Sequence, residues 1–223
     1  MLLTVLNIII DYKEAFLQGL LVTASLCLII WSAGLVLGTL LGYLGAENPN
    51  EFGKFTKVLS FILSGIPILV LLFWLNYPFQ QMLQIVINPF IVAAFAISVV
   101  NIIAVADIVR TALSEFPRQY IIAGQVCGMK SRDIFKKIQF PIIFRQIIPS
   151  LLTTQVNMLQ LTLFASLISV GEIFRVAQEI NSVIYKPVEI YSTLGVFFLI
   201  ICLPLNGLAL YLKNKYTRNL SEK

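Results

Sequence analysis

The dominant feature of this sequence is a series of apolar stretches, each of a length suited to crossing a membrane. A helix needs roughly 20 apolar residues to span about 30 Å of hydrocarbon, and only helices or closed barrels satisfy their own backbone hydrogen bonds there. The stretches are residues 16–43, 58–75, 89–112, 149–170 and 190–212. We therefore predict an all-α integral membrane protein with about five transmembrane helices.

Composition agrees with a membrane protein and excludes other classes. Hydrophobic residues make up 58% of the chain and charged residues 12%, whereas a soluble domain is typically about 25% charged. In such a chain the net charge of +5 reflects membrane topology and not nucleic-acid binding. The chain has no histidine and three widely separated cysteines, so we expect no metal site and no cofactor.

The distribution of lysine and arginine predicts the orientation. Five spans place the two chain ends on opposite sides of the membrane. If the C-terminus is cytoplasmic, all sixteen basic residues except Lys13, Arg175 and Lys186 lie on the cytoplasmic side. This bias follows the positive-inside rule. We expect the N-terminus outside, the C-terminus in the cytoplasm, and one transmembrane domain over residues 1–223.

Glycine and proline positions predict where helices pack closely and where one breaks. Gly34, Gly38 and Gly42 share one helix face, which allows close approach of a neighbouring helix. We favour packing within the chain over a dimer contact. Gly65 and Pro67 interrupt the second apolar stretch, and a kink or break is expected there.

The segment between the third and fourth stretches, residues 113–148, holds the densest charge in the chain and needs structure of its own. Residues 121–125 favour a short helix, and Gly128 suits a left-handed helix end. A second, amphipathic helix is expected to be capped by Ser131 and ended by Pro141. Physical reasoning alone leaves two functions open: lying on the membrane surface, or docking a soluble partner.

This segment resembles the cytoplasmic EAA signature of ATP-binding-cassette importer permeases, which reads roughly EAA, three residues, G, then a phenylalanine and I-x-L-P. Arg145 and Pro149 are similar to the R…P pattern of the polar amino-acid permeases of the histidine, glutamine and arginine type. Four further fragments resemble that family in the same order: "LQGLLVTASL", "SGIPILV", "ADIVRTAL" and "LTLFASLISVGEI". The resemblance covers about residues 17–215. The matching signature positions are Ala123, Gly128, Phe135, Ile138, Phe140 and Pro141.

The resemblance implies a permease subunit of an ATP-driven importer in the bacterial plasma (inner) membrane, with a polar amino acid as the solute. It implies three protein partners: a separate ATPase subunit, a second permease subunit, identical or homologous, and an extracytoplasmic solute-binding protein. The chain has no G-x-x-x-x-G-K-[ST] phosphate loop, so we expect it not to be an enzyme itself. The positions assigned to the ATPase-coupling loop are Ile122, Ala123, Gly124, Gly128, Phe135 and Pro141.

The chain also departs from the family pattern. Ile122 stands where the signature has its glutamate, and Gly124 where it has its second alanine. These changes bear on the strength or symmetry of coupling to the ATPase. The family's K-D-T-S run is replaced by residues 160–163, "QLTL", which bears on the identity of the solute.

Polar residues in the apolar stretches are the candidates for the solute pathway, because such side chains are costly in hydrocarbon unless they meet water or partners. Interhelical or own-backbone hydrogen bonding is the alternative. Near the third stretch, Asp107 and Arg110 are spaced to pair with one another. The pathway candidates are Asn101, Gln155, Asn157, Gln160, Thr162, Ser166 and Ser169, of which Gln155, Thr162, Ser166 and Ser169 are expected to form one stripe.

Charged residues outside the stretches have two interpretations each. Glu172, Arg175 and Glu179 either receive the binding protein or are a solvated face. The basic residues of the 113–148 segment contact membrane lipid headgroups or the ATPase; we favour lipids for most of them. The rival functions are a secondary transporter or channel subunit, which would require membrane-embedded acids, and a membrane enzyme, for which no catalytic cluster is present.

Overall fold

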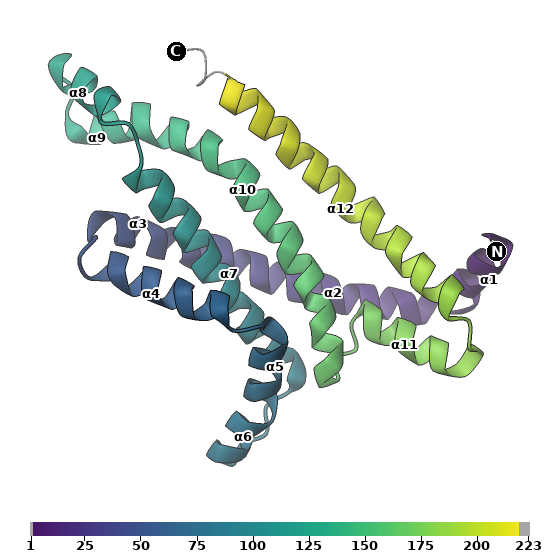
Figure 1. Cartoon of the computed structure of the whole chain (residues 1–223). Helices are drawn as coiled ribbons and strands as arrows, with labels where there is room; N and C mark the ends of the chain where they lie inside the picture. The colour runs from purple at the N-terminus through teal and green to yellow at the C-terminus, as the bar shows by residue number, and fades with distance from the viewer. Residues whose placement is uncertain (1, 219–223) are drawn as a thin grey trace.

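The computed structural model describes residues 2–218, with side chains described for residues 7–216, and all regular secondary structure in this part of the chain is helical. Figure 1 shows the arrangement of the helices. The elements are α1 (Leu2–Asp11), α2 (Lys13–Ala33), π-helical η1 (Gly34–Gly38), α3 (Thr39–Glu47), α4 (Phe52–Gly65), α5 (Ile68–Asn76), α6 (Pro78–Leu83), α7 (Pro89–Ser114), α8 (Arg118–Val126), α9 (Ser131–Ile134), π-helical η2 (Phe135–Gln139), α10 (Phe140–Leu161), 3-10-helical η3 (Thr162–Ile168), α11 (Ile173–Ile184) and α12 (Pro187–Arg218).

Four continuous helices are long and apolar enough to cross a membrane, and a fifth candidate span is broken. The all-helical prediction is confirmed, and the count is four or five, depending on whether the broken pair is one span. The fourth span is longer than predicted, because it starts at residue 131 instead of 149. The continuous spans are Lys13–Glu47, Pro89–Ser114, Ser131–Ile168 and Pro187–Tyr216.

Helix α7 forms the centre of the bundle. Its residues Ala93 and Ile97 are fully buried against Leu26 and Ile30 of α2. Helix α12 is peripheral, because only 17% of the most apolar stretch of its span is buried, against 56% of the corresponding stretch of α7. It runs along the outer side of α10, as Figure 1 shows. Other helices therefore enclose α7, whereas most of the surface of α12 is exposed.

The predicted glycine face packs within the chain, which confirms that expectation. A Cβ at Gly38 would come within 2.7 Å of the carbonyl oxygen of Ile102, and one at Gly42 within 2.6 Å of that of Ala106. At Gly34 it would meet the Asn101 side chain. The α2–η1–α3 span therefore lies backbone to backbone on α7, at a distance that only glycine allows.

The predicted break at Gly65 and Pro67 is also present. Helix α4 ends at Gly65, Ile66 is extended, and α5 begins after Pro67. The α4 axis and the α5–α6 axis differ by 91°. Because Pro67 has no backbone N–H and restricts the residue before it to extended conformations, one straight helix is impossible here.

Two details of the charged segment differ from prediction. Pro141 does not end the second helix, since α9, η2, α10 and η3 form one continuous 38-residue helix. The wide π turn of η2 ends just before Pro141 and offsets the carbonyl that its ring would otherwise strike. Ser131 is the first helical residue and not the N-cap, which is Lys130 without a side-chain bond.

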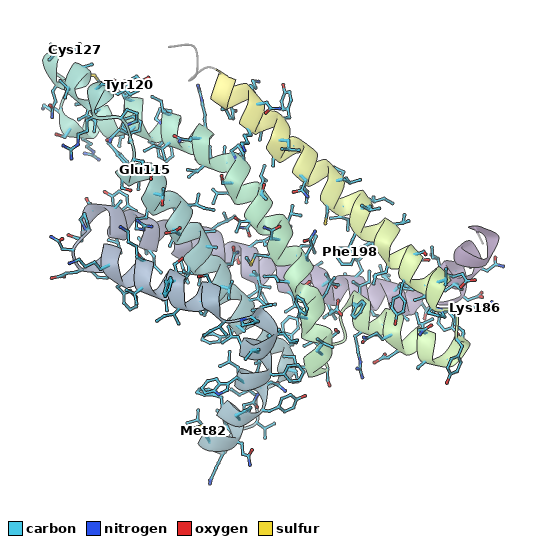
Figure 2. All side chains as sticks on the ribbon, in the orientation of Figure 1. Met82, Glu115, Tyr120, Cys127, Lys186 and Phe198 are labelled. Carbon is cyan, nitrogen blue, oxygen red and sulfur yellow. The ribbon has the colours of Figure 1, made fainter. Side chains whose placement is uncertain are left out.

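Helix α1 and the last turns of α12 lie at opposite ends of the bundle, an arrangement that agrees with five crossings. In Figure 1, α1 and the α11–α12 connection lie at one end, and α8, α9 and the last turns of α12 at the other. Cys127 and Lys186, labelled in Figure 2, mark these two ends. We call the α8 end the basic end, because α8, α9, η2 and the last turns of α12 carry seven of the sixteen basic residues, whereas the opposite end has only Lys13, Arg175 and Lys186.

Candidate functional site

A row of polar side chains runs along the exposed face of α10. Its spacing alternates between four and three residues, which keeps the row on one helix face. All five members are exposed in the isolated chain. We call them the polar stripe: Gln146, Ser150, Thr153, Asn157 and Gln160.

The polar stripe would be energetically unfavourable if this face of α10 were in contact with lipid. Amides and hydroxyls in hydrocarbon have no hydrogen-bonding partners, and each unsatisfied group costs several kcal/mol. Ser150, Asn157 and Gln160 form no side-chain hydrogen bond within the described residues, while Thr153 bonds to the carbonyl of Pro149 at 3.1 Å. The arrangement therefore requires water or another polypeptide against this face.

An open cleft of about 760 Å³ continues the polar stripe at the basic end, between α10 and α12. Arg145 and Lys213 project from the two helices into the lining. Deeper in the bundle the helices close on each other, where Val156 and Leu159 of α10 pack with Cys202 of α12. The other lining residues are Ile142, Gln146, Pro149, Ser150, Thr153, Thr154, Ala209, Leu210 and Tyr216.

Two predicted pathway residues form a buried amide pair instead of lining an open surface. The Asn101 Nδ2 donates to Gln155 Oε1 at 3.0 Å and to the carbonyl of Ile30 at 2.9 Å. The Gln155 Nε2 donates to Asn101 Oδ1 at 3.3 Å, and the Trp31 Nε1 donates to the carbonyl of Gln155 at 3.1 Å. This pair joins three spans, since Ile30 and Trp31 belong to α2, Asn101 to α7 and Gln155 to α10.

The predicted stripe of Gln155, Thr162, Ser166 and Ser169 does not exist as one face. The α-helix ends at Leu161 and continues as the tighter 3-10 helix η3, so the spacing of 3.6 residues per turn no longer applies. Thr162 and Ser166 are buried and donate to the carbonyls of Leu159 and Leu163, both at 2.7 Å. Ser169 is exposed, with left-handed backbone, at the end of η3.

Only Asn157 and Gln160 of the predicted pathway residues lie on the polar stripe. Prediction missed Gln146, Ser150 and Thr153, although their alternating spacing is visible in the sequence. The stripe predicted from the sequence began instead at Gln155, which lies on the opposite, buried side of α10.

The predicted coupling segment forms a helical hairpin at the basic end. Helix α8 ends in a Schellman motif: Gly128, at φ 76°, donates to the carbonyl of Gln125 at 2.9 Å, and Met129 donates to that of Gly124 at 3.0 Å. The left-handed conformation predicted for Gly128 is confirmed. It turns the chain from α8 into α9.

One face of α8 packs inward and the other is exposed. Gly124 is buried against Ile134, which a Cβ at this position would approach to 2.9 Å. On the opposite face Ile122 and Val126 are 56% and 82% exposed, one helical turn apart. Ala123 is exposed beside them.

Phe135 and Pro141 have structural positions in the same hairpin. The Phe135 ring meets the Tyr43 ring edge to face, with centroids 6.2 Å apart, so η2 contacts the α3 end. Pro141 occupies the first turn of α10. Helix α9 is therefore continuous with α10 through η2.

Several charged residues near the spans are paired or buried. Asp107 and Arg110 form the predicted ion pair on α7. Glu172 is fully buried and caps α11, accepting from the N–H groups of Phe174 at 2.9 Å and Arg175 at 2.8 Å. It is therefore not available to a partner on the surface, contrary to one of its two interpretations. The exposed pair of Arg175 and Glu179, at 2.9 Å, remains accessible.

Burial also sets the titration of Glu172. Loss of water around its carboxyl raises the pKa from 4.5 to about 7, against the opposing effect of the two backbone donors. The N–H of Ile173 donates to Thr23 Oγ1 at 3.1 Å. The first three N–H groups of α11 are thus all satisfied, and the helix is fixed to α2.

Comparison with known proteins places this architecture among transport systems. The family described as "Binding-protein-dependent transport system inner membrane component" matches residues 34–218. A histidine/lysine/arginine/ornithine transport system permease protein of Escherichia coli (strain K12) is 23% identical over 220 residues, covering 92% of this chain and 95% of that protein. The glutamine transport system permease protein of the same organism is 25% identical over 191 residues, covering 85% and 87%.

A solved structure has the same fold. The crystal structure of an amino acid ABC transporter with histidines superposes with a TM-score of 0.82, covering 93% of this chain and 96% of that chain at 20% identity. At this identity the likeness concerns the fold.

Proposed function

This chain belongs to the family of binding-protein-dependent transport system inner membrane components, and from that membership we propose that it forms one half of the solute pathway of an ATP-driven importer for polar amino acids. As a family member it is a multi-pass inner-membrane permease subunit of an ATP-binding-cassette transporter, the non-catalytic component of that system, and such a component works with an ATPase subunit. The amino-acid solute is inferred from the relatives, which are named for histidine, lysine, arginine, ornithine and glutamine.

The polar stripe is the observation that carries the proposal. Its five side chains lie on a membrane-spanning helix, yet no part of the described chain covers them. A second permease subunit, identical or homologous, placed against this face would enclose a water-filled path and supply the missing half. Asn157 and Gln160 line this path in the proposal.

Most of the other predicted pathway residues do not line the path but stabilise the helices that form it. The Asn101–Gln155 pair fixes the rotation of α10 relative to α2 and α7, and so fixes the direction in which the stripe points. Thr162 and Ser166 satisfy the tightened turns of η3. Ser169, exposed at the end of η3, lies near the outer entrance of the path in this arrangement.

The helical hairpin of residues 113–148 is proposed as the coupling unit. Ile122 and Val126 of α8 offer an apolar contact to the ATPase subunit, with Ala123 between them. Gly124 holds α8 on Ile134 and Gly128 makes the turn, so the helix moves as part of the hairpin. Phe135 and Pro141 transmit that movement to α10.

We assign the basic end to the cytoplasm and residues 1–223 to a single transmembrane domain. The positive-inside rule supports the orientation, because Lys13, Arg175 and Lys186 belong to the segments at the other end. The exposed basic residues of α9 and η2 are proposed to contact anionic lipid headgroups. The opposite end, with the Arg175–Glu179 pair, is available to a solute-binding protein.

Reconstitution of the complex tests the proposal. The chain, purified from native membranes with its partners, is placed in proteoliposomes, and ATP-dependent uptake of a labelled amino-acid mixture is measured. The double variant Asn157→Leu/Gln160→Leu is expected to lower uptake at least tenfold while the ATPase still co-purifies. Ser32→Val is the matched control, because the Ser32 hydroxyl is exposed on α2 and already bonded to its own helix. Unchanged uptake in the double variant, or a pure complex without an ATPase, would contradict the proposal.

A further inference from the structure

The cleft between α10 and α12 has the charge of an anion-binding site. Arg145 and Lys213 line it, and no acidic residue of the described part of the chain does. Within the described side chains, neither cation forms an ion pair. Helix α10 and η3 contain no acid, and the only acid in α12, Glu189, lies in its first turn at the opposite end.

Two cations that form no ion pair within the described side chains give the cleft a positive potential. Ile142, Pro149 and Leu210 form low-dielectric walls around the cleft. Charges of one sign in such a cleft concentrate ions of the opposite sign. The cleft therefore attracts anions and repels cations.

The cleft also has the size and donors for a small carboxylate. Its volume of about 760 Å³ lies in the range typical of small-molecule sites. A guanidinium offers two parallel N–H donors that match a carboxylate, and the hydroxyls of Ser150 and Thr154 add neutral donors beside it.

The cleft lies on the path proposed above. Gln146, Ser150 and Thr153 belong both to the polar stripe and to the cleft lining. A solute that follows the stripe towards the basic end consequently passes Arg145 and Lys213 before it leaves the permease.

We propose that Arg145 and Lys213 bind the carboxylate of the transported amino acid, so that the path accepts amino acids of zero or negative net charge and rejects cationic ones. This inference rests on the proposed function and narrows its solute. The absence of acidic residues from α10 also disfavours cationic amino acids, because no carboxylate is present on this helix to stabilise a cation.

The charge of the cleft is measured first, without reference to any solute. Thr153→Cys is introduced with Cys127→Ser, which removes the exposed native cysteine and leaves Cys27 and Cys202 buried. In the purified complex, the rates of modification by an anionic (sulfonatoethyl) and a cationic (trimethylammonioethyl) methanethiosulfonate are compared. The anionic-to-cationic rate ratio is expected to fall roughly fivefold or more in Arg145→Gln/Lys213→Gln.

Lys215→Gln is the matched control for that ratio. Lys215 is exposed on the same helix but lies over the Tyr211 ring and not in the cleft lining. It is expected to leave the ratio within twofold. A ratio that Arg145→Gln/Lys213→Gln does not lower overturns the inference. Because both residues are exposed, the double variant is expected to elute as the intact complex.

Uptake then tests the selection. Proteoliposomes with the full complex and its binding protein are given glutamine, glutamate or arginine. Uptake of glutamine or glutamate that falls at least tenfold in the double variant, but not in Lys215→Gln, supports the inference. ATP-driven uptake of arginine overturns it and leaves the proposed function standing. ATP-driven uptake of none of the common amino acids overturns the proposed function. Protection of the thiol introduced by Thr153→Cys by phosphatidylglycerol vesicles, and not by glutamate, would assign the cleft to lipid and also overturn the inference.

Discussion

The Asn101 side chain occupies the space that a side chain at Gly34 would need. A Cβ at position 34 would lie 2.1 Å from Asn101 Nδ2, the atom that bonds to Ile30 and Gln155. The absence of a side chain on α2–η1 thus lets a polar group of α7 reach α10. The close backbone packing at Gly34 is therefore a condition for the buried Asn101–Gln155 pair. The position of the polar stripe depends on that pair.

Gly34→Ala is expected to destabilise the protein by about 2 kcal/mol, because overpacking of a closed interface costs about 1–3 kcal/mol. The measurement is the thermal unfolding midpoint in detergent. Asn101→Ala in the same chain is expected to recover part of the loss, since it removes the atoms that the new methyl group strikes. Gly195→Ala, where no atom lies within 4 Å of the added Cβ, is the control and should not lower the midpoint. Equal effects at positions 34 and 195 would contradict this account.

Cys127 reports the orientation of the chain. It is exposed at the tip of the α8 end, whereas Cys27 and Cys202 are buried. A membrane-impermeant maleimide is expected to label inside-out vesicles and to leave intact spheroplasts unlabelled. Cys127→Ser should abolish the signal. Labelling of spheroplasts and not of inside-out vesicles would place the basic end outside and reject the orientation.

Gly128→Val is expected to lower ATP-driven uptake at least tenfold without affecting membrane insertion. The φ of 76° is strained for a β-branched residue, so the turn between α8 and α9 would open and the hairpin would lose its shape. Gly128→Asn is the matched variant, since asparagine tolerates the left-handed conformation, and it should keep at least half of the uptake. Wild-type uptake by Gly128→Val would show that this turn has no part in coupling.

Glu172 is expected to make stability depend on pH. Its pKa is raised from 4.5 to about 7 by burial, so the folded state holds the proton more tightly than the unfolded state. The destabilisation caused by burying the charged carboxylate is absent below about pH 4.5 and complete above about pH 7. The stability of the folded state should therefore rise as pH falls between these values. At its largest this contribution is about 3 kcal/mol.

The Glu172 contribution is isolated by comparing thermal unfolding at pH 5.5 and pH 8.0 in two variants. Glu172→Gln should flatten the difference, because its amide oxygen still accepts a backbone N–H but carries no charge. Glu179→Gln, on the exposed face of the same helix, should leave the difference unchanged. An identical pH dependence in wild type and Glu172→Gln would show that this carboxyl does not titrate in the range.

Local chain chemistry made several parts of this structure predictable. The apolar stretches could be recognised because a membrane helix must be apolar over its whole length. Gly65 and Pro67 predicted the break, and Gly128 the left-handed turn, because each restricts the backbone at its own position. Pro141 was misleading because the π turn that accommodates it lies in the preceding segment, residues 135–139, and not at the proline itself.

The role of each polar residue of α10 depends on packing across the bundle. The order of residues along the chain was enough to establish that α10 is a helix with polar residues on more than one face. Packing against α2 and α7 then fixed its rotation, burying Gln155 with Asn101 and exposing Asn157 and Gln160. The cleft likewise joins Arg145 and Lys213 from helices far apart in the chain. A residue's neighbours along the chain set its backbone, but only the neighbours across the bundle determine whether its side chain meets protein or water.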